Sequence, residues 1–124
     1  MIFSLHLGLL LLRLGLGGVF LWFGVDKFLS PLVWMNWIPA WFLPYLGDSS
    51  SLFLYGLGAV EILLGLFVLL GYYSRWAAGG ALLLLLGIVA SFGLNEIMIR
   101  DLGLAFLALG IVALGPGAWS ANRR

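Results

Sequence analysis

The sequence lacks cysteine altogether, has a single histidine and carries few charged residues. Without cysteine, the chain has no disulfides, thiolate metal ligands, iron–sulfur clusters or thiol redox chemistry of its own. One histidine cannot ligate a haem iron from both sides, and neither an HExxH pattern nor a Ser/His/Asp set is present. A net charge of +1 leaves no basic surface for nucleic acid. The sequence therefore shows no catalytic, haem, flavin or metal signature, and it leaves open whether the protein is an enzyme.

Apolar side chains make up most of what is present. Hydrophobic residues account for 64% of the 124 positions and charged residues for 9%. An ordinary soluble domain has about half apolar and about a quarter charged residues. A chain of this size has too much surface for its volume to bury so many apolar side chains. The remainder must face a medium other than water, which predicts an integral membrane protein in contact with the lipid bilayer.

Four apolar stretches have nearly the length of a membrane-spanning helix, roughly 20 residues. They cover about residues 5–29, 52–70, 76–92 and 96–114. Ser30-Pro31 ends the first stretch, because proline disfavours helix at the residue before it, and Gly71 and Gly115 end later ones. The sequence predicts an all-α membrane protein with a single transmembrane domain over residues 1–124. Its expected architecture is a four-transmembrane-helix bundle.

The connection between the first two stretches, residues 31–51, is long and rich in aromatic residues. Tryptophans such as Trp37 and Trp41 prefer the membrane–water boundary. Pro39 and Pro44 prevent one continuous helix. We expect a bent, aromatic interfacial segment over one end of the bundle, which serves as an anchor, as a lid or as a surface that docks a partner.

Positive charges near the ends of the spans set the expected orientation. Four spans put both termini on one side, together with Arg75, Arg123 and Arg124, whereas Lys27 and Arg100 lie near the other side. We therefore expect a multi-pass protein of the cell membrane with both termini cytoplasmic. A cleaved signal peptide is not expected, because no positively charged region precedes the first apolar stretch.

Seven ionisable residues lie within or at the ends of the predicted spans. A charge at the bilayer centre costs about 2.5–3.5 kcal/mol, so such residues normally face the bundle interior and pair with one another. They form the candidate polar cluster and binding site, with Trp37 and Trp41 above it: Glu61, Arg100, Lys27, Asp26, Glu96, Asp101 and Arg13. Glu61 is the most informative of them, because it lies mid-span with Gly58 and Gly65 on its face. No metal-ligand spacing accompanies the cluster.

Helical spacing predicts that these charges share faces with glycines, which let membrane helices approach closely. On the first helix the stripe is Arg13, Gly17, Phe20, Gly24 and Lys27. On the fourth helix the same spacing gives Glu96, Arg100, Gly103, Leu107 and Gly110. We expect Glu61 to lie within reach of Arg100 and to pair with Arg13, and Lys27 to extend to the headgroups. The sequence thus predicts a charged, glycine-lined cavity in the outer half of the bundle.

Several short pieces, taken in order, resemble the DoxX family of small four-helix membrane proteins. They are Arg13-Leu14, the run from Phe20 to Phe28, the run from Gly58 to Gly65, Arg75, and the run from Asn95 to Leu104. The family is named for a subunit associated with an archaeal thiosulfate:quinone oxidoreductase, and other members are linked to membrane redox complexes. The resemblance implies an accessory or binding subunit of a membrane, redox-associated complex. Its partner would be another membrane protein or further copies of itself, and its bound molecule a quinone or a lipid.

Other functions stay open at this level. A quinone-linked oxidoreductase component needs an apolar slot with a few polar groups near the quinone carbonyls, which Arg100, Lys27 and the tryptophans could supply. A small proton or solute transporter would need an oligomer, because four short helices enclose little space. A salt bridge that only fixes helix register is the competing structural interpretation of the charges.

Overall fold

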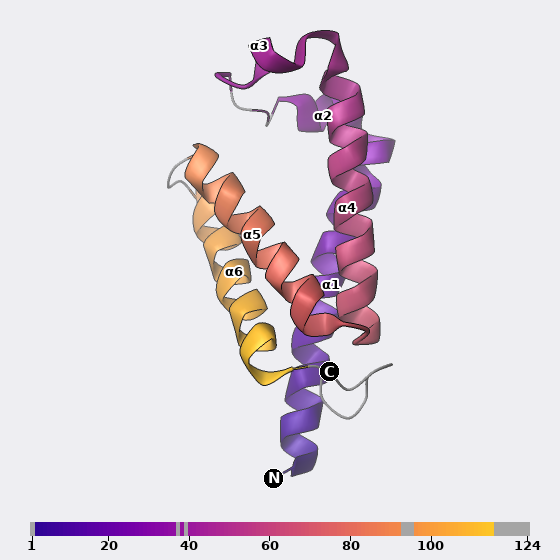
Figure 1. The fold of residues 1–124 in the computed structure, drawn as a ribbon, viewed down its shortest axis with the longest axis vertical. Helices are drawn as coiled ribbons and strands as arrows, with labels where there is room; N and C mark the ends of the chain where they lie inside the picture. The colour runs from indigo at the N-terminus through magenta and orange to yellow at the C-terminus, as the bar shows by residue number, and fades with distance from the viewer. Residues whose placement is uncertain (1, 37, 39, 93–95, 116–124) are drawn as a thin grey trace.

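The computed structural model describes residues 2–36, 38, 40–92 and 96–115, and within these ranges every regular element is helical (Figure 1). The long helices are α1 (Ile2–Leu29), α4 (Ser50–Leu70), α5 (Ser74–Phe92) and α6 (Glu96–Leu114). Between α1 and α4 lie three short elements, α2 (Pro31–Met35), α3 (Leu43–Leu46) and the 3-10 turn η1 (Gly47–Ser49). The all-α class predicted from the sequence is confirmed.

Proline and glycine determine where helices end. Ser30 leaves the helical region with ψ 58°, and Pro31 opens α2 at a position where its missing N–H costs nothing. Gly71 ends α4 in the left-handed conformation at φ 73°. There the Gly71 N–H donates to the Val68 carbonyl and the Tyr72 N–H to the Phe67 carbonyl, as in a Schellman motif.

Helices α1 and α4 lie antiparallel and touch through two pairs of glycines. A Cβ added at Gly24 would lie 2.7 Å from the Gly58 carbonyl oxygen, and one at Gly17 would lie 2.8 Å from the Gly65 carbonyl oxygen. The reverse contacts are equally close, so the two backbones meet directly at both levels. Small residues at regular helical spacing allow this close approach in an apolar medium.

Helices α5 and α6 form a second pair, which joins the first at one end of the molecule and leans away from it toward the end that carries α2 and α3 (Figure 1). Most of the side chains that α5 and α6 contribute to the hydrophobic core are alanines. The core cluster comprises Leu16, Phe20, Val68, Ala77, Ala78, Ala81, Leu85, Ala105, Ala108 and Ile111. Between the two pairs, the end near α2 and α3 is therefore more open than the other.

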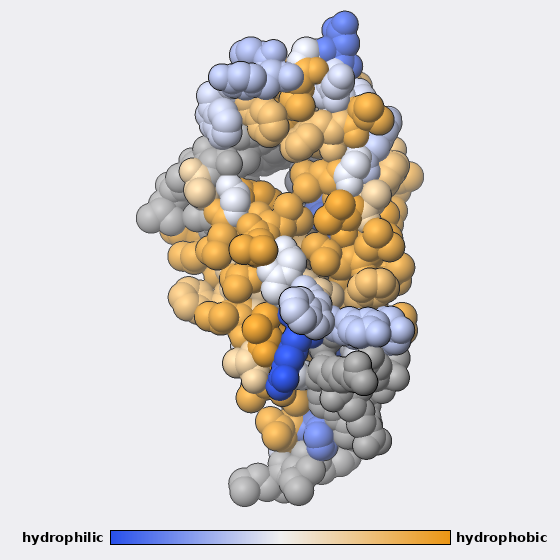
Figure 2. All heavy atoms as spheres, viewed as in Figure 1, coloured by the Kyte–Doolittle hydropathy of each residue, from blue (hydrophilic) through white to orange (hydrophobic). Residues whose placement is uncertain are grey.

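The outer surface is apolar over most of its length. Figure 2 shows hydrophobic residues covering the middle of the visible face, and large side chains such as Trp22, Leu83 and Phe106 are exposed. Among the described residues, Ser4–Leu29 and Leu43–Leu70 are long and apolar enough to cross a membrane, and Arg75–Ile88 is a shorter apolar helix. Such a surface is stable in lipid rather than in water.

Replacing a glycine at the α1–α4 contact should destabilise the protein. We expect Gly65→Ala to lower the free energy of unfolding by about 1–3 kcal/mol, because the added methyl group overpacks against the backbone of α1. Gly15→Ala is the matched control, since a Cβ at Gly15 meets nothing within 4 Å. Unfolding by sodium dodecyl sulfate, followed by circular dichroism, measures both variants. Equal stability of the two would contradict the close contact.

Candidate functional site

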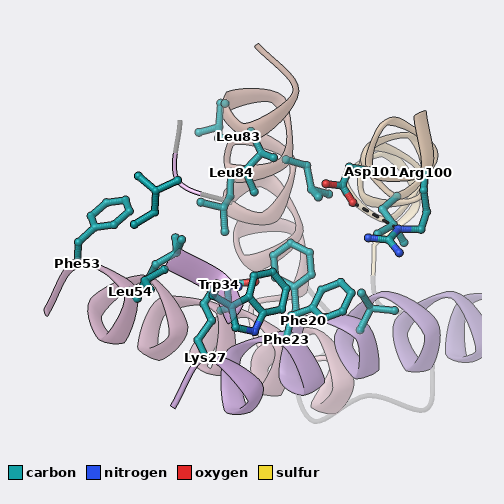
Figure 3. A pocket seen from close by; sticks show the side chains of 18 of the residues that line it. Phe20, Phe23, Lys27, Trp34, Phe53, Leu54, Leu83, Leu84, Arg100 and Asp101 are labelled. Carbon is teal, nitrogen blue, oxygen red and sulfur yellow. Dashed lines mark ion pairs between the residues drawn. The ribbon is translucent and has the colours of Figure 1, made fainter. Parts of the chain in front are cut away.

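A cavity of about 560 Å³ lies where the two helix pairs diverge. All four long helices line it, and Trp34, Ile38 and Phe42 of the connecting segment do so as well. Most of its walls are apolar. The charged side chains that reach it are Lys27, Glu61, Arg100 and Asp101. Figure 3 shows Lys27 and Trp34 on one side of this space, and Arg100 and Asp101 across from them on α6.

Lys27 and Glu61 form a buried ion pair in the wall of the cavity. The Lys27 Nζ lies 2.6 Å from the Glu61 Oε1, and each side chain is only 6% exposed. Lys27 shares the buried face of α1 with Gly24 and Gly17, so it points at α4 and not along the membrane surface. The expectation that Lys27 extends to the headgroups is therefore wrong. Its charge is neutralised by direct contact, which is strongest where water is excluded.

Arg13 is not the partner of Glu61. It is buried on α1, but fourteen residues separate it from Lys27. At 1.5 Å per residue that is about 21 Å along the helix. Because Glu61 contacts Lys27, it lies beyond the reach of an arginine at that distance. Arg13 belongs to the end of the bundle where the helices converge, and it does not line the cavity.

The charged stripe expected on α6 is rotated relative to the observed buried face. Asp101 is buried together with Ala105, Ala108 and Ile111, whereas Gly103 and Leu107 are exposed. The prediction that Gly103 and Leu107 face the interior is therefore wrong, whereas Arg100 lines the cavity and Gly110 is half-buried. Alanines, which are small enough to pack closely, supply the contact surface that glycines supply on α1 and α4.

Arg100 lies at the rim of the cavity and not inside it. Its side chain is 58% exposed, and its Nε lies 3.8 Å from the Asp101 Oδ1. Its guanidinium lies over the ring of Phe23, with the Cζ 5.6 Å from the ring centroid. Glu61, which was expected to lie within reach of Arg100, forms its ion pair with Lys27. The side chain of Glu96, another candidate, lies outside the described part of the structure.

Trp34 is a site residue that the sequence interpretation did not single out from the other aromatic residues of the connecting segment. Its Nε1 donates a 2.9 Å hydrogen bond to the Asp26 Oδ2, and its ring lies over the Lys27 Nζ at 3.9 Å from the centroid. Phe23 meets the same ring edge to face at 5.5 Å. Three neighbouring side chains of α1 thus hold one tryptophan of α2. The usable signal was the sharp Ser30–Pro31 break, which folds the following turn back over the end of α1.

The tryptophans predicted to cover the site are placed differently. Trp41 is 60% exposed and does not line the cavity. It stacks on Phe42, and Phe42 in turn lines the cavity and packs against Phe53. Trp37 lies outside the described residues. Asp26 also acts indirectly, because its carboxylate binds Trp34 and does not line the cavity.

The site has the chemistry of a binding pocket for an apolar molecule. Phenylalanine and leucine side chains supply its apolar surface, and Lys27 and Arg100 offer hydrogen-bond donors to an acceptor group. Within the described ranges, no group of three or more histidine, aspartate or glutamate side chains is placed to hold a metal ion.

Removing one partner of the buried ion pair should cost far more than removing both. We expect Glu61→Leu to lower the free energy of unfolding by about 3–5 kcal/mol, because it leaves the Lys27 ammonium buried without a counter-charge. The double variant Lys27→Met/Glu61→Leu should recover most of this loss. Unfolding in detergent, followed by circular dichroism, tests both. A double variant as unstable as the single one would show that the charges do not interact.

The chain matches the sequence model of one known family, described as DoxX, over residues 8–94. The matched region runs from the first turns of α1 through the connecting segment and α4 to the end of α5, so it includes Lys27, Trp34 and Glu61. No significant match to a curated protein or to a solved structure was found. Since the match covers well over half of the chain, and its helices present an apolar surface, the protein is an integral membrane protein that belongs to the DoxX family.

Proposed function

We propose that this protein is an accessory subunit of a membrane, redox-associated complex and that it binds a small apolar molecule in the cavity between its two helix pairs. The observation that carries the proposal is the 560 Å³ cavity itself, with apolar walls and a neutralised ion pair. Its size falls within the range of about 300–1,000 Å³ that is common for ligand sites. An ion pair that served only to fix the register of α1 and α4 would not need an open cavity beside it.

The proposed arrangement in the membrane has four spans. Helices α5 and α6 have 19 residues each, a length of about 28 Å, which nearly matches a hydrocarbon core of about 30 Å. The start of α1 and the end of α6 lie toward the same end of the molecule, opposite α2 and α3 (Figure 1). We place that end on the cytoplasmic side and the aromatic connecting segment at the outer membrane–water boundary.

Labelling of introduced cysteines tests this topology, because the natural chain has none to react. Ser4 and Ser49 are both exposed and lie at opposite ends of the molecule. In right-side-out vesicles, Ser49→Cys should react with a membrane-impermeant maleimide, and Ser4→Cys should react only after the membrane is permeabilised. Reaction of Ser4→Cys in sealed vesicles would place the start of α1 outside and contradict the proposed orientation.

A quinone is the ligand class that the cavity suits best. Its ring would lie among Phe20, Phe23 and Leu84, and its carbonyl oxygens would accept hydrogen bonds from Lys27 or Arg100. The chain would bind and orient the quinone, and electrons would come from a partner subunit, because the sequence carries no haem, flavin or metal signature. A membrane lipid is the other apolar molecule of suitable chemistry.

Quinone binding should change the fluorescence of the cavity tryptophan. We expect a short-chain ubiquinone to quench the purified protein saturably and Arg100→Ala to weaken its binding by about tenfold, the usual effect of losing one charge-assisted hydrogen bond. Arg75→Ala is the matched control, because Arg75 does not line the cavity. The absence of saturable quenching in the wild type would contradict quinone binding.

Native mass spectrometry of protein extracted gently from its own membrane tests the accessory role. A co-purifying subunit that Arg100→Ala loses and Arg75→Ala retains would support it, and equal retention by both variants would contradict a partner site at the cavity. A homo-oligomer that carries no quinone and supports a flux in liposomes would favour transport instead.

A further inference from the structure

The connecting segment acts as a roof over the cavity, and few side chains hold it there. None of the residues of α2, α3 or η1 is buried, and Ile38 is the one buried residue among those described between α2 and α3. The described side chains of this segment that line the cavity are Trp34, Ile38 and Phe42. The segment leaves α1 at the non-helical Ser30, so the direction of α2 is set at one residue. A movement of α2 at this point would open the cavity without disturbing the contact between α1 and α4.

Trp34 joins this roof to α1 through a hydrogen bond and a cation–π contact. Its indole N–H donates to Asp26, and its ring covers Lys27. The Lys27 ammonium is thereby enclosed between two groups, the Trp34 ring at 3.9 Å and the Glu61 carboxylate at 2.6 Å. A cation over a ring is held more weakly than a cation in contact with a carboxylate in an apolar site. An incoming molecule that approaches Lys27 therefore displaces the indole and not Glu61.

On the basis of the proposed binding function, we infer that Trp34 gates the cavity: an entering molecule moves the indole off Lys27, and its headgroup takes the place of the ring on the ammonium. Trp34 is thus a positioning residue that decides when Lys27 is available. In the closed state, the Trp34 ring occupies the position on the Lys27 ammonium that the headgroup of a bound molecule would take.

The charges around the gate restrict which headgroups can enter. Lys27 is matched by Glu61, and Arg100 lies beside Asp101. The two basic and two acidic side chains that line the cavity therefore already balance each other. An anionic headgroup would add a further negative charge. The gate therefore selects an uncharged headgroup that accepts a hydrogen bond, such as a carbonyl or a hydroxyl group on an apolar body.

Lysine-specific labelling tests the gate directly, because Lys27 is the only lysine in the sequence. A water-soluble N-hydroxysuccinimide ester acylates the purified protein in micelles, and peptide mass spectrometry compares Lys27 with the α-amino group of the same chain. We expect Trp34→Ala to raise the rate at Lys27 by about tenfold or more, because the cation–π contact and the hydrogen bond are lost. Trp34→Phe, which keeps an aromatic ring, should give a smaller rise.

Two further variants separate the gate from a general loss of structure. Trp22→Ala is the control, because Trp22 is 70% exposed on α1 and does not line the cavity; its Lys27 rate should equal that of the wild type. Asp26→Ala releases the indole without changing the cavity wall, and it should also raise the rate. It keeps the proposal testable even where Trp34→Ala does not fold. Wild-type rates in both Trp34→Ala and Asp26→Ala would overturn the gate.

A short-chain ubiquinone added to Trp34→Ala distinguishes the gate from the proposed function. Protection of Lys27 by the quinone would support both, since the headgroup then covers the ammonium. Faster labelling without protection would support Trp34 as the cover of Lys27 and contradict the quinone as its replacement. Unchanged labelling together with saturable quinone binding would overturn the gate and leave the binding function standing.

Discussion

A contact between one ammonium and one carboxylate, both withdrawn from water, governs how this bundle can be arranged. Neither Lys27 nor Glu61 can stay charged in an apolar medium unless the other is at hand, and their 2.6 Å separation requires that α1 and α4 approach closely. The glycine pair Gly24 and Gly58, one turn away from the charges, makes that approach possible. Charge and packing thus depend on the same small stretch of two helices.

The size of the side chains decides where the bundle is closed and where it is open. Alanines such as Ala78, Ala81 and Ala108 fill the region where the two helix pairs converge. Toward α2 and α3 the facing side chains are larger, among them Phe23, Phe53 and Leu84, and they line a space that they do not fill. The cavity follows from the angle between the two pairs, and the ion pair lies at its wall because α1 stays beside α4 at this end of the molecule.

Local chemistry made the helices and one buried face readable from the sequence. Proline at 31 and glycine at 71 mark helix ends, and the glycine–charge spacing on α1 corresponds to residues that are buried throughout. The face of α6 was misjudged because periodicity gives a spacing but not a rotation, and both the glycine stripe and the alanine stripe are made of small residues. The partner of Glu61 depended on how far α1 and α4 slide past each other, which no local pattern specifies.

Trp34 could not be singled out for a related reason. The connecting segment contains several aromatic residues of similar character, and composition alone treats them as equivalent anchors. Their roles separate only when the chain reverses at Ser30 and brings one of them over Lys27. Trp41 is exposed, as expected of an aromatic residue at the membrane–water boundary, whereas Trp34 contacts Asp26 and Lys27, two adjacent residues of α1.

The divergence of the two helix pairs also gives the molecule unequal cross-sections in the two leaflets of a bilayer. At the convergent end the side chains of the four long helices fill the space between them, so the surrounding acyl chains contact a closely packed protein surface. At the divergent end any volume that neither the roof nor a ligand occupies is open to lipid tails. A molecule that bound in the cavity would therefore compete with lipid tails for the same space, and the lateral pressure and chain composition of that leaflet would become part of its binding equilibrium.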